Sequence, residues 1–199
     1  MTQEVLFRVI LTGLFLTAIS TSIYFRSKAN ISSGEKVSRQ EEGRFLLVAL
    51  RVGGLLLWLS IIIYLINPAW MSWASIALPD WLRWSGVAGG MLAVAFLVWM
   101  FRSLGRNITD TVAIRRDHSL ITHGPYRWIR HPLYTFGALF ILSFGIVAGN
   151  WLIAALSFAA FVLLALRTPI EEAKLLDRFG DDYQDYMQRT GRFLPRLSR

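Results

Sequence analysis

The sequence predicts an all-α, polytopic integral membrane protein with five transmembrane helices, and three observations support this. Of its 199 residues, 54% are hydrophobic and only 17% are charged, whereas a soluble domain carries about 25% charged residues. The apolar residues occur in long blocks, and a helix needs about 20 residues at 1.5 Å rise to cross a bilayer. Most of the 21 Lys and Arg residues lie between these blocks, as in the loops of a membrane protein.

The first three spans are expected at residues 5–25, 45–66 and 85–101. The first block is too long for the apolar core of a signal peptide and is followed by Tyr24-Phe25-Arg26, a poor cleavage site. A further apolar stretch, residues 133–166, is interrupted only by Ala148-Gly149-Asn150. This interruption predicts a tight turn between a fourth and a fifth span.

The distribution of charge predicts the orientation of the chain. Arg and Lys gather in residues 26–44, 102–130 and 167–199, whereas the connection 67–84 contains only Arg83. By the positive-inside rule the N-terminus lies outside and the C-terminus in the cytoplasm, as for a bacterial inner-membrane protein. The outer connection carries Trp70, Trp73, Trp81 and Trp84, which we interpret as an aromatic belt at the membrane surface.

A net charge of +8 fits either nucleic acid or an anionic membrane surface. The apolar blocks favour the bilayer as the partner, and no nucleic acid is expected. With no Cys residue, the chain has no disulfide framework, thiolate metal site or cysteine nucleophile. The spacing of His118, His123 and His131 lacks accompanying carboxylates, so no metal site is predicted.

Polar chemistry concentrates in two cytoplasmic stretches, residues 117–134 and 167–186. The first holds all three His residues and ends where Pro132 can occupy the first turn of the fourth span. The second places Leu175, Leu176, Phe179, Tyr183 and Tyr186 at helical spacing. It predicts an amphipathic cytoplasmic helix with a break at Gly180.

Several separated motifs occur in order across residues 116–195. They are His118-Ser-Leu-Ile-Thr-x-Gly-Pro-Tyr126, Arg130-His131-Pro132-x-Tyr134, Arg167-x-x-x-Glu171-Glu172, Phe179-Gly-x-x-Tyr183-x-x-Tyr186 and Arg192-Phe-Leu-Pro195. This pattern resembles the isoprenylcysteine carboxyl methyltransferase family and the related phospholipid methyltransferases. The resemblance covers the C-terminal two-fifths of the chain, and the N-terminal half matches only in hydropathy.

The resemblance implies S-adenosylmethionine as the cofactor, bound in a cytoplasmic pocket that the C-terminal half forms. No G-x-G-x-x-G dinucleotide fingerprint competes with it in the sequence. By the resemblance, the following residues line the cofactor site: His118, Ser119, Leu120, Ile121, Tyr126, His131, Pro132, Leu133, Tyr134 and Glu171. Glu171 is expected at the start of the last helix.

The resemblance also places Arg167 near the methyl acceptor, which implies a lipophilic acceptor whose carboxylate a guanidinium would bind. The expected acceptor is a prenylcysteine-like molecule or another small lipid-like molecule. A carboxylate is already ionised at neutral pH, so no protein nucleophile or general base is nominated. An amine or thiol acceptor would make His123 or Glu172 a candidate base.

One departure from the family pattern concerns the acceptor. Pro169-Ile170 stands where the family often has further acids, and it is expected to kink the junction between span and helix. The departure therefore concerns the acceptor more than the cofactor.

We divide the chain into a three-span region, residues 1–101, and a methyltransferase region, residues 102–199. A membrane reductase with a nicotinamide cofactor and a non-catalytic scaffold are the alternatives.

Overall fold

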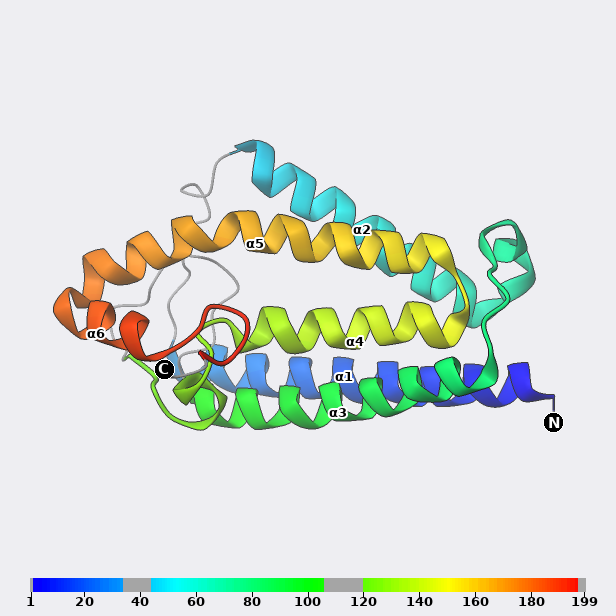
Figure 1. Ribbon diagram of the computed structural model, residues 1–199, viewed down its shortest axis with the longest axis horizontal. Coiled ribbons are helices and arrows are strands. Elements are labelled where there is room, and N and C mark those ends of the chain that lie inside the picture. Colours follow the sequence, from blue (N-terminus) through cyan, green and yellow to red (C-terminus); the bar gives the residue numbers. More distant parts are fainter. Residues whose placement is uncertain (1, 34–43, 106–119, 197–199) are drawn as a thin grey trace.

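The computed structural model describes residues 2–33, 44–105 and 120–196, and in these ranges the protein is helical (Figure 1). The prediction of an all-α membrane protein is confirmed. The elements, in chain order, are α1 (Gln3–Ser33), α2 (Arg44–Ile66), η1 (Pro68–Ala74), α3 (Asp80–Leu104), η3 (Gly124–Arg127), α4 (Pro132–Ala148), α5 (Trp151–Phe179) and α6 (Asp181–Arg189).

The order of the helices in space differs from their order in the chain. α3 packs against both α1 and α4, α4 also packs against α5, and α2 packs on α5, which it crosses obliquely (Figure 1). α1 and α2 therefore have little contact although they are consecutive in sequence. The N-terminus and the end of the described chain lie at opposite ends of the bundle.

Four helices are long and apolar enough to cross a membrane: α1, α2, α3 and α5. α4 is apolar but has only 17 residues, about 25 Å at 1.5 Å per residue, against a hydrocarbon core of about 30 Å. The protein is thus a multi-pass membrane protein, and the count of five spans remains a prediction for α4.

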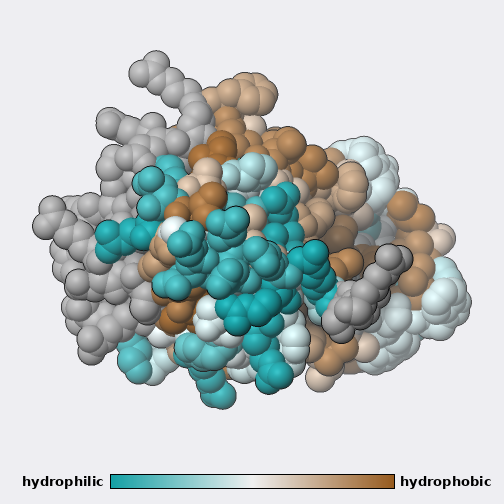
Figure 2. All heavy atoms as spheres, turned by 60° about the vertical axis from the view of Figure 1, so that its left-hand side comes forward, coloured by the Kyte–Doolittle hydropathy of each residue, from teal (hydrophilic) through white to brown (hydrophobic). Residues whose placement is uncertain are grey.

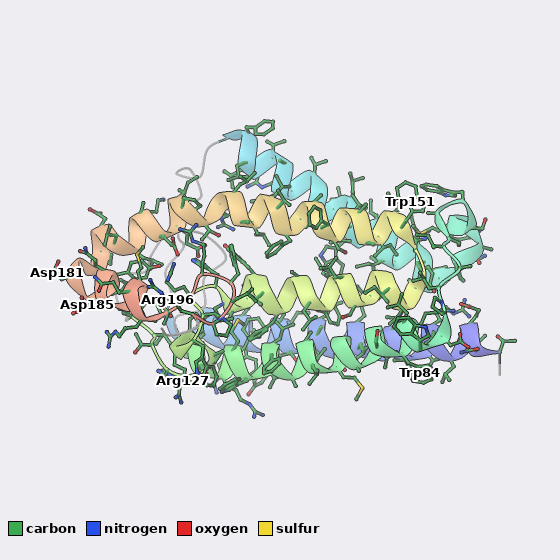
Figure 3. The ribbon with its side chains drawn as sticks, in the orientation of Figure 1. Trp84, Arg127, Trp151, Asp181, Asp185 and Arg196 are labelled. Atoms are coloured by element: carbon green, nitrogen blue, oxygen red, sulfur yellow. The ribbon has the colours of Figure 1, made fainter. Side chains whose placement is uncertain are left out.

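The two ends of the bundle differ in chemistry. Trp84 and Trp151 lie at the end near the N-terminus, and Arg127, Asp181 and Arg196 at the other (Figure 3). Hydrophilic atoms gather over the α6 end, with hydrophobic atoms on the flanks (Figure 2). The four tryptophans of the predicted belt are all exposed, as membrane-surface anchors would be. Which end faces the cytoplasm remains a prediction.

The predicted turn between the last two spans is confirmed. α4 ends at Ala148, and Gly149 adopts φ 57°, a left-handed conformation that glycine tolerates without steric cost. The Oδ1 atom of buried Asn150 accepts a hydrogen bond from Ile153 N at 3.1 Å and so caps α5. The turn is fixed to the outer connection because Ile76 N donates to Gly149 O at 2.7 Å.

α5 differs from its predicted form. The helix continues through Pro169 and ends at Phe179, and Gly180 separates it from α6 as expected. Glu171 therefore does not begin the last helix but lies inside α5. Pro169 removes only one backbone donor, and the polar contacts of the residues beyond it hold the final turns in helical form.

Arg83, buried to 7% exposure, attaches α1 to the rest of the bundle. Its Nε donates to Val147 O at 2.9 Å, its guanidinium forms a two-point ion pair with Glu4, and it lies 4.1 Å from the ring centroid of Phe7. The only basic residue of the connection 67–84 thus has a structural partner on α1.

Small residues allow α3 and α4 to approach closely at Gly86 and Gly89. A Cβ atom on Gly86 would lie 2.8 Å from Val147 Cγ2 and 3.2 Å from Ser143 O. Gly54 of α2 differs, because a Cβ atom there would meet nothing within 4 Å.

Replacing Gly86 by Ala should destabilise the bundle by about 1–3 kcal/mol, because the added methyl group must push α4 away from α3. Thermal unfolding of the detergent-purified protein measures this loss. Gly54→Ala is the matched control and should leave the melting temperature unchanged or raise it, since helical Ala is favoured over Gly by up to about 1 kcal/mol. Equal effects of the two substitutions would contradict the packing described here.

Candidate active site

The loop before α4 is anchored at both of its ends. Gly124–Arg127 forms the short helix η3, whose Pro125 is buried. Pro132 occupies the first turn of α4, as predicted, and His131 precedes it as the N-cap residue. Thr135 Oγ1 donates to Phe193 O at 2.8 Å, so the start of α4 is also tied to the C-terminal segment. The polar side chains of the motif are therefore fixed around one helix N-terminus.

A cavity of about 450 Å³ lies where α4 begins. Nine of the eleven predicted site residues line it: Leu120, Ile121, Tyr126, His131, Pro132, Leu133, Tyr134, Arg167 and Glu171. These residues come from the loop, from α4 and from α5, across more than 50 positions of sequence. Tertiary structure thus brings together residues that the motifs singled out separately.

Four further residues were considered from sequence. His118 and Ser119 fall outside the described residues. His123 is exposed, and Glu172 is buried; neither belongs to the lining of the cavity. In the described ranges, no group of three or more His, Asp or Glu side chains could hold a metal ion.

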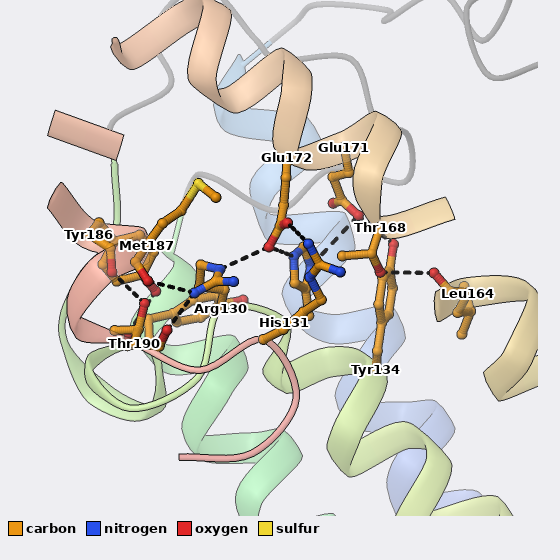
Figure 4. Close-up of polar contacts among 12 residues, drawn as sticks. Arg130, His131, Tyr134, Leu164, Thr168, Glu171, Glu172, Tyr186, Met187 and Thr190 are labelled. Carbon is orange, nitrogen blue, oxygen red and sulfur yellow. Dashed lines mark hydrogen bonds and ion pairs between the residues drawn. The ribbon is translucent and has the colours of Figure 1, made fainter. Parts of the chain in front are cut away.

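Glu171 faces the cavity and is oriented by two aromatic side chains. Tyr134 Oη donates to its Oε2 at 2.7 Å, and His131 Nδ1 lies 3.8 Å from the same oxygen (Figure 4). The rings of His131 and Tyr134 are stacked, with centroids 5.4 Å apart. A carboxylate and two π-faces therefore border the same part of the cavity.

Glu172, the neighbouring carboxylate, is buried to 5% exposure and makes a different set of contacts. Its Oε1 accepts from Arg130 Nε at 2.8 Å and lies 3.3 Å from His131 Nε2. Its Oε2 accepts from an Arg192 guanidinium nitrogen at 2.5 Å. One carboxylate of α5 thus binds the loop before α4 and the C-terminal segment together (Figure 4).

Arg130 extends this connection to the end of α6. One guanidinium nitrogen donates to Met187 O at 3.1 Å and to Thr190 O. The backbone completes the attachment, because Arg130 N donates to Gly191 O at 2.9 Å and Gly191 N donates to Trp128 O at 3.1 Å. The C-terminal segment is therefore part of the site's frame.

Buried tyrosines of α6 and η3 close the same region. Tyr186 Oη donates to Tyr126 O at 2.6 Å, which joins α6 to the loop. Burial raises the pKa of Tyr126, Tyr183 and Tyr186 above the usual range of a phenol. All three side chains are consequently neutral hydrogen-bond donors at any physiological pH.

The lining also includes residues that sequence reasoning did not select. Arg26 comes from α1, Leu104 from α3, and Phe161 and Leu164 from α5. The apolar ones carry no sequence signal, because they are ordinary residues of membrane helices. The position of Arg26 just after the first predicted span could have indicated it, but its charge was assigned to a cytoplasmic loop.

Comparison with known proteins places this site in a family. The model of the isoprenylcysteine carboxyl methyltransferase (ICMT) family matches residues 87–177. The solved structure of the eukaryotic intramembrane Ras methyltransferase ICMT superimposes with a TM-score of 0.56 at 25% identity, covering 94% of this chain and 67% of that one. Residues 87–177 of the chain therefore match the ICMT family, and the fold resembles that of the solved ICMT structure.

Two curated relatives show how broad the ICMT family is. Protein-S-isoprenylcysteine O-methyltransferase of Tribolium castaneum is 33% identical, over 58% of this chain and 42% of its own. Methanethiol S-methyltransferase 2 of Bradyrhizobium diazoefficiens is 31% identical, over 63% of this chain and 53% of its own. The chain thus spans about half the length of these relatives, whose names state different acceptors.

The matched ICMT region runs from α3 to the last turns of α5. It contains the loop before α4, the whole of α4, Arg167 and both glutamates. α1, α2, α6 and the C-terminal segment lie outside it. Part of the cavity wall is therefore built from residues beyond the shared region.

Glu172→Gln should lower the free energy of unfolding by about 3 kcal/mol, because it leaves Arg130 buried without its carboxylate. Thermal or denaturant unfolding in detergent measures this. Glu171→Gln is the matched control: its side chain is 26% exposed and accepts a hydrogen bond from Tyr134, so we expect a loss below about 1 kcal/mol. A larger loss for Glu171→Gln would reverse the roles assigned to the pair.

Proposed function

We propose that the protein is an S-adenosylmethionine-dependent methyltransferase of the membrane that acts on a lipophilic acceptor. The observation that carries this proposal is the gathering of nine predicted site residues around one cavity in a chain whose residues 87–177 match the ICMT family. Its volume of about 450 Å³ lies in the usual range for sites that enclose a small organic ligand.

The groups around the cavity suit S-adenosylmethionine. Glu171 offers a carboxylate for ribose hydroxyl groups or the ammonium group. The stacked rings of His131 and Tyr134 offer π-faces for the adenine or for a sulfonium cation. When bound, this cofactor supplies a methyl group on a sulfonium, which a carboxylate oxygen accepts by direct displacement. The proposed cofactor residues are the eight that line the cavity apart from Arg167, together with His118 and Ser119.

The protein's own task would be to orient the acceptor and to exclude water. Arg167 lies on the cavity wall, directly after the apolar run 151–166 of α5. Its planar guanidinium can bind both oxygens of a carboxylate and thereby fix their direction. The neighbouring apolar wall, with Phe161 and Leu164, suits the hydrocarbon part of the same molecule.

The contacts of the remaining polar groups favour an acceptor that has no proton to lose. Glu172 is already bound to two arginines, and His123 lies outside the cavity lining. The two bases considered for an amine or thiol acceptor are thus poorly placed for that role. A carboxylate acceptor, such as that of an isoprenylcysteine, needs neither.

Glu171→Gln should weaken S-adenosylmethionine binding about tenfold, because it removes a charged hydrogen-bond acceptor from the cavity. Calorimetric titration of the detergent-purified protein measures the affinity. Asp177→Asn, an exposed position of the same helix, is the control and should bind like the unmodified protein. Unchanged affinity in Glu171→Gln would remove Glu171 from the site. If the unmodified protein binds a reduced nicotinamide cofactor and not S-adenosylmethionine, the result favours the reductase alternative. If it binds neither cofactor, the result favours a non-catalytic scaffold.

Arg167→Met should leave S-adenosylmethionine affinity within about a factor of two while methyl transfer to N-acetyl-S-farnesyl-cysteine falls about a hundredfold. Transfer of a radiolabelled methyl group measures the second effect. Arg178→Met, on an exposed turn further along α5, should retain transfer. Loss of cofactor affinity in Arg167→Met, with transfer otherwise normal at saturation, would assign this arginine to the cofactor.

A further inference from the structure

α1 contributes a charged side chain to the cavity wall. Arg26 lines the cavity together with Arg167, although the two residues are 141 positions apart in the sequence. Arg26 lies outside residues 87–177, the part of the chain that matches the ICMT family. Its position is therefore a property of this chain's own N-terminal helix.

The guanidinium of Arg26 is held in place by its surroundings. Its Nε donates to Ser22 Oγ, one turn earlier, at 3.0 Å. The guanidinium carbon lies 5.9 Å from the ring centroid of Phe101, and Phe25 stacks on the same ring at 5.7 Å with an interplanar angle of 7°. Contacts between the ends of α1 and α3 thus orient the charge in advance, which reduces the entropy lost when it binds an anion.

The charges around the cavity have an excess of one sign. Among the described residues, its lining includes the guanidiniums of Arg26, Arg130 and Arg167 and the carboxylate of Glu171. Arg130 belongs to the Glu172 cluster, whereas Arg26 and Arg167 come to the cavity from α1 and α5. A cavity with low-dielectric walls and excess positive charge favours anionic ligands.

Part of the cavity is lined by hydrocarbon from three helices. The apolar lining residues of α3, α4 and α5 include Leu104, Leu133, Ile141, Phe161, Leu164 and Leu175. Leu104 belongs to α3, which Phe25 and Arg26 contact through Phe101. The cationic and apolar portions of the wall therefore adjoin each other, as an amphiphile with an anionic end would require.

We propose that Arg26 is a specificity-determining residue that, together with Arg167, binds the carboxylate of the methyl acceptor. This inference rests on the proposed function for the nature of the acceptor. An ionised acceptor gains a charge-assisted interaction with Arg26, whereas a thiol or an amide of the same shape leaves that guanidinium without the gain. α1 thus selects anionic acceptors over neutral ones in a cavity lined mostly by residues of the region that matches the family.

The test compares binding of N-acetyl-S-farnesyl-cysteine with that of its uncharged carboxamide, measured by tryptophan fluorescence in detergent and without any methyl donor. The unmodified protein should prefer the acid by about tenfold or more. Arg26→Met should reduce this preference about tenfold, and Arg26→Lys should retain part of it. Arg26→Gln tests the same charge where Arg26→Met does not fold. Lys28→Met, an exposed cation of the same helix outside the cavity lining, should keep the full preference.

An acid preference in Arg26→Met or Arg26→Gln equal to that of the unmodified protein would overturn the inference, as would an equal loss in Lys28→Met. Absence of any preference in the unmodified protein would overturn it as well. A separate titration of the same preparations with S-adenosylmethionine reports on the proposed function. If S-adenosylmethionine does not bind but the acid preference is observed, the proposed function is contradicted. The role of Arg26 in binding the acid is then still supported.

Discussion

The buried carboxylate of Glu172 is the interaction on which the site depends. Burial of a carboxylate in an apolar environment is costly unless it is paired and hydrogen-bonded. Here Arg130, His131 and Arg192 surround it. Because these partners come from the loop before α4 and from the C-terminal segment, neutralising one charge fixes three segments of the chain relative to each other.

In this arrangement two adjacent glutamates have different roles, one structural and one facing the cavity. Glu172 faces the loop and the C-terminal segment, while Glu171 points to the cavity and is held by Tyr134. His131 lies between them, with one ring nitrogen toward each carboxylate. Adjacent helical residues point about 100° apart, since a turn contains 3.6 residues. One helix can thus supply a structural and a ligand-facing carboxylate from consecutive positions.

The membrane-spanning part of the bundle has a different basis from the polar end. Close contact of α3 with α4, and the Arg83–Glu4 pair at the far end, set the positions of the helices. α2 packs on α5, and none of its described residues lines the cavity. The region that matches the ICMT family supplies most of the cavity lining, and α1, α6 and the end of α5 complete the wall.

The sequence by itself determined the all-α class, the turn at Gly149, the break at Gly180 and most of the cavity's polar lining, because these depend on local composition and on short motifs. Only the tertiary structure decided that α2 packs on α5, that α5 continues through Pro169, and that Glu172 is enclosed by arginines. It also brought Arg26 of α1 to the cavity. Such contacts join residues far apart in the chain, and nothing in the local sequence specifies which helices will be neighbours.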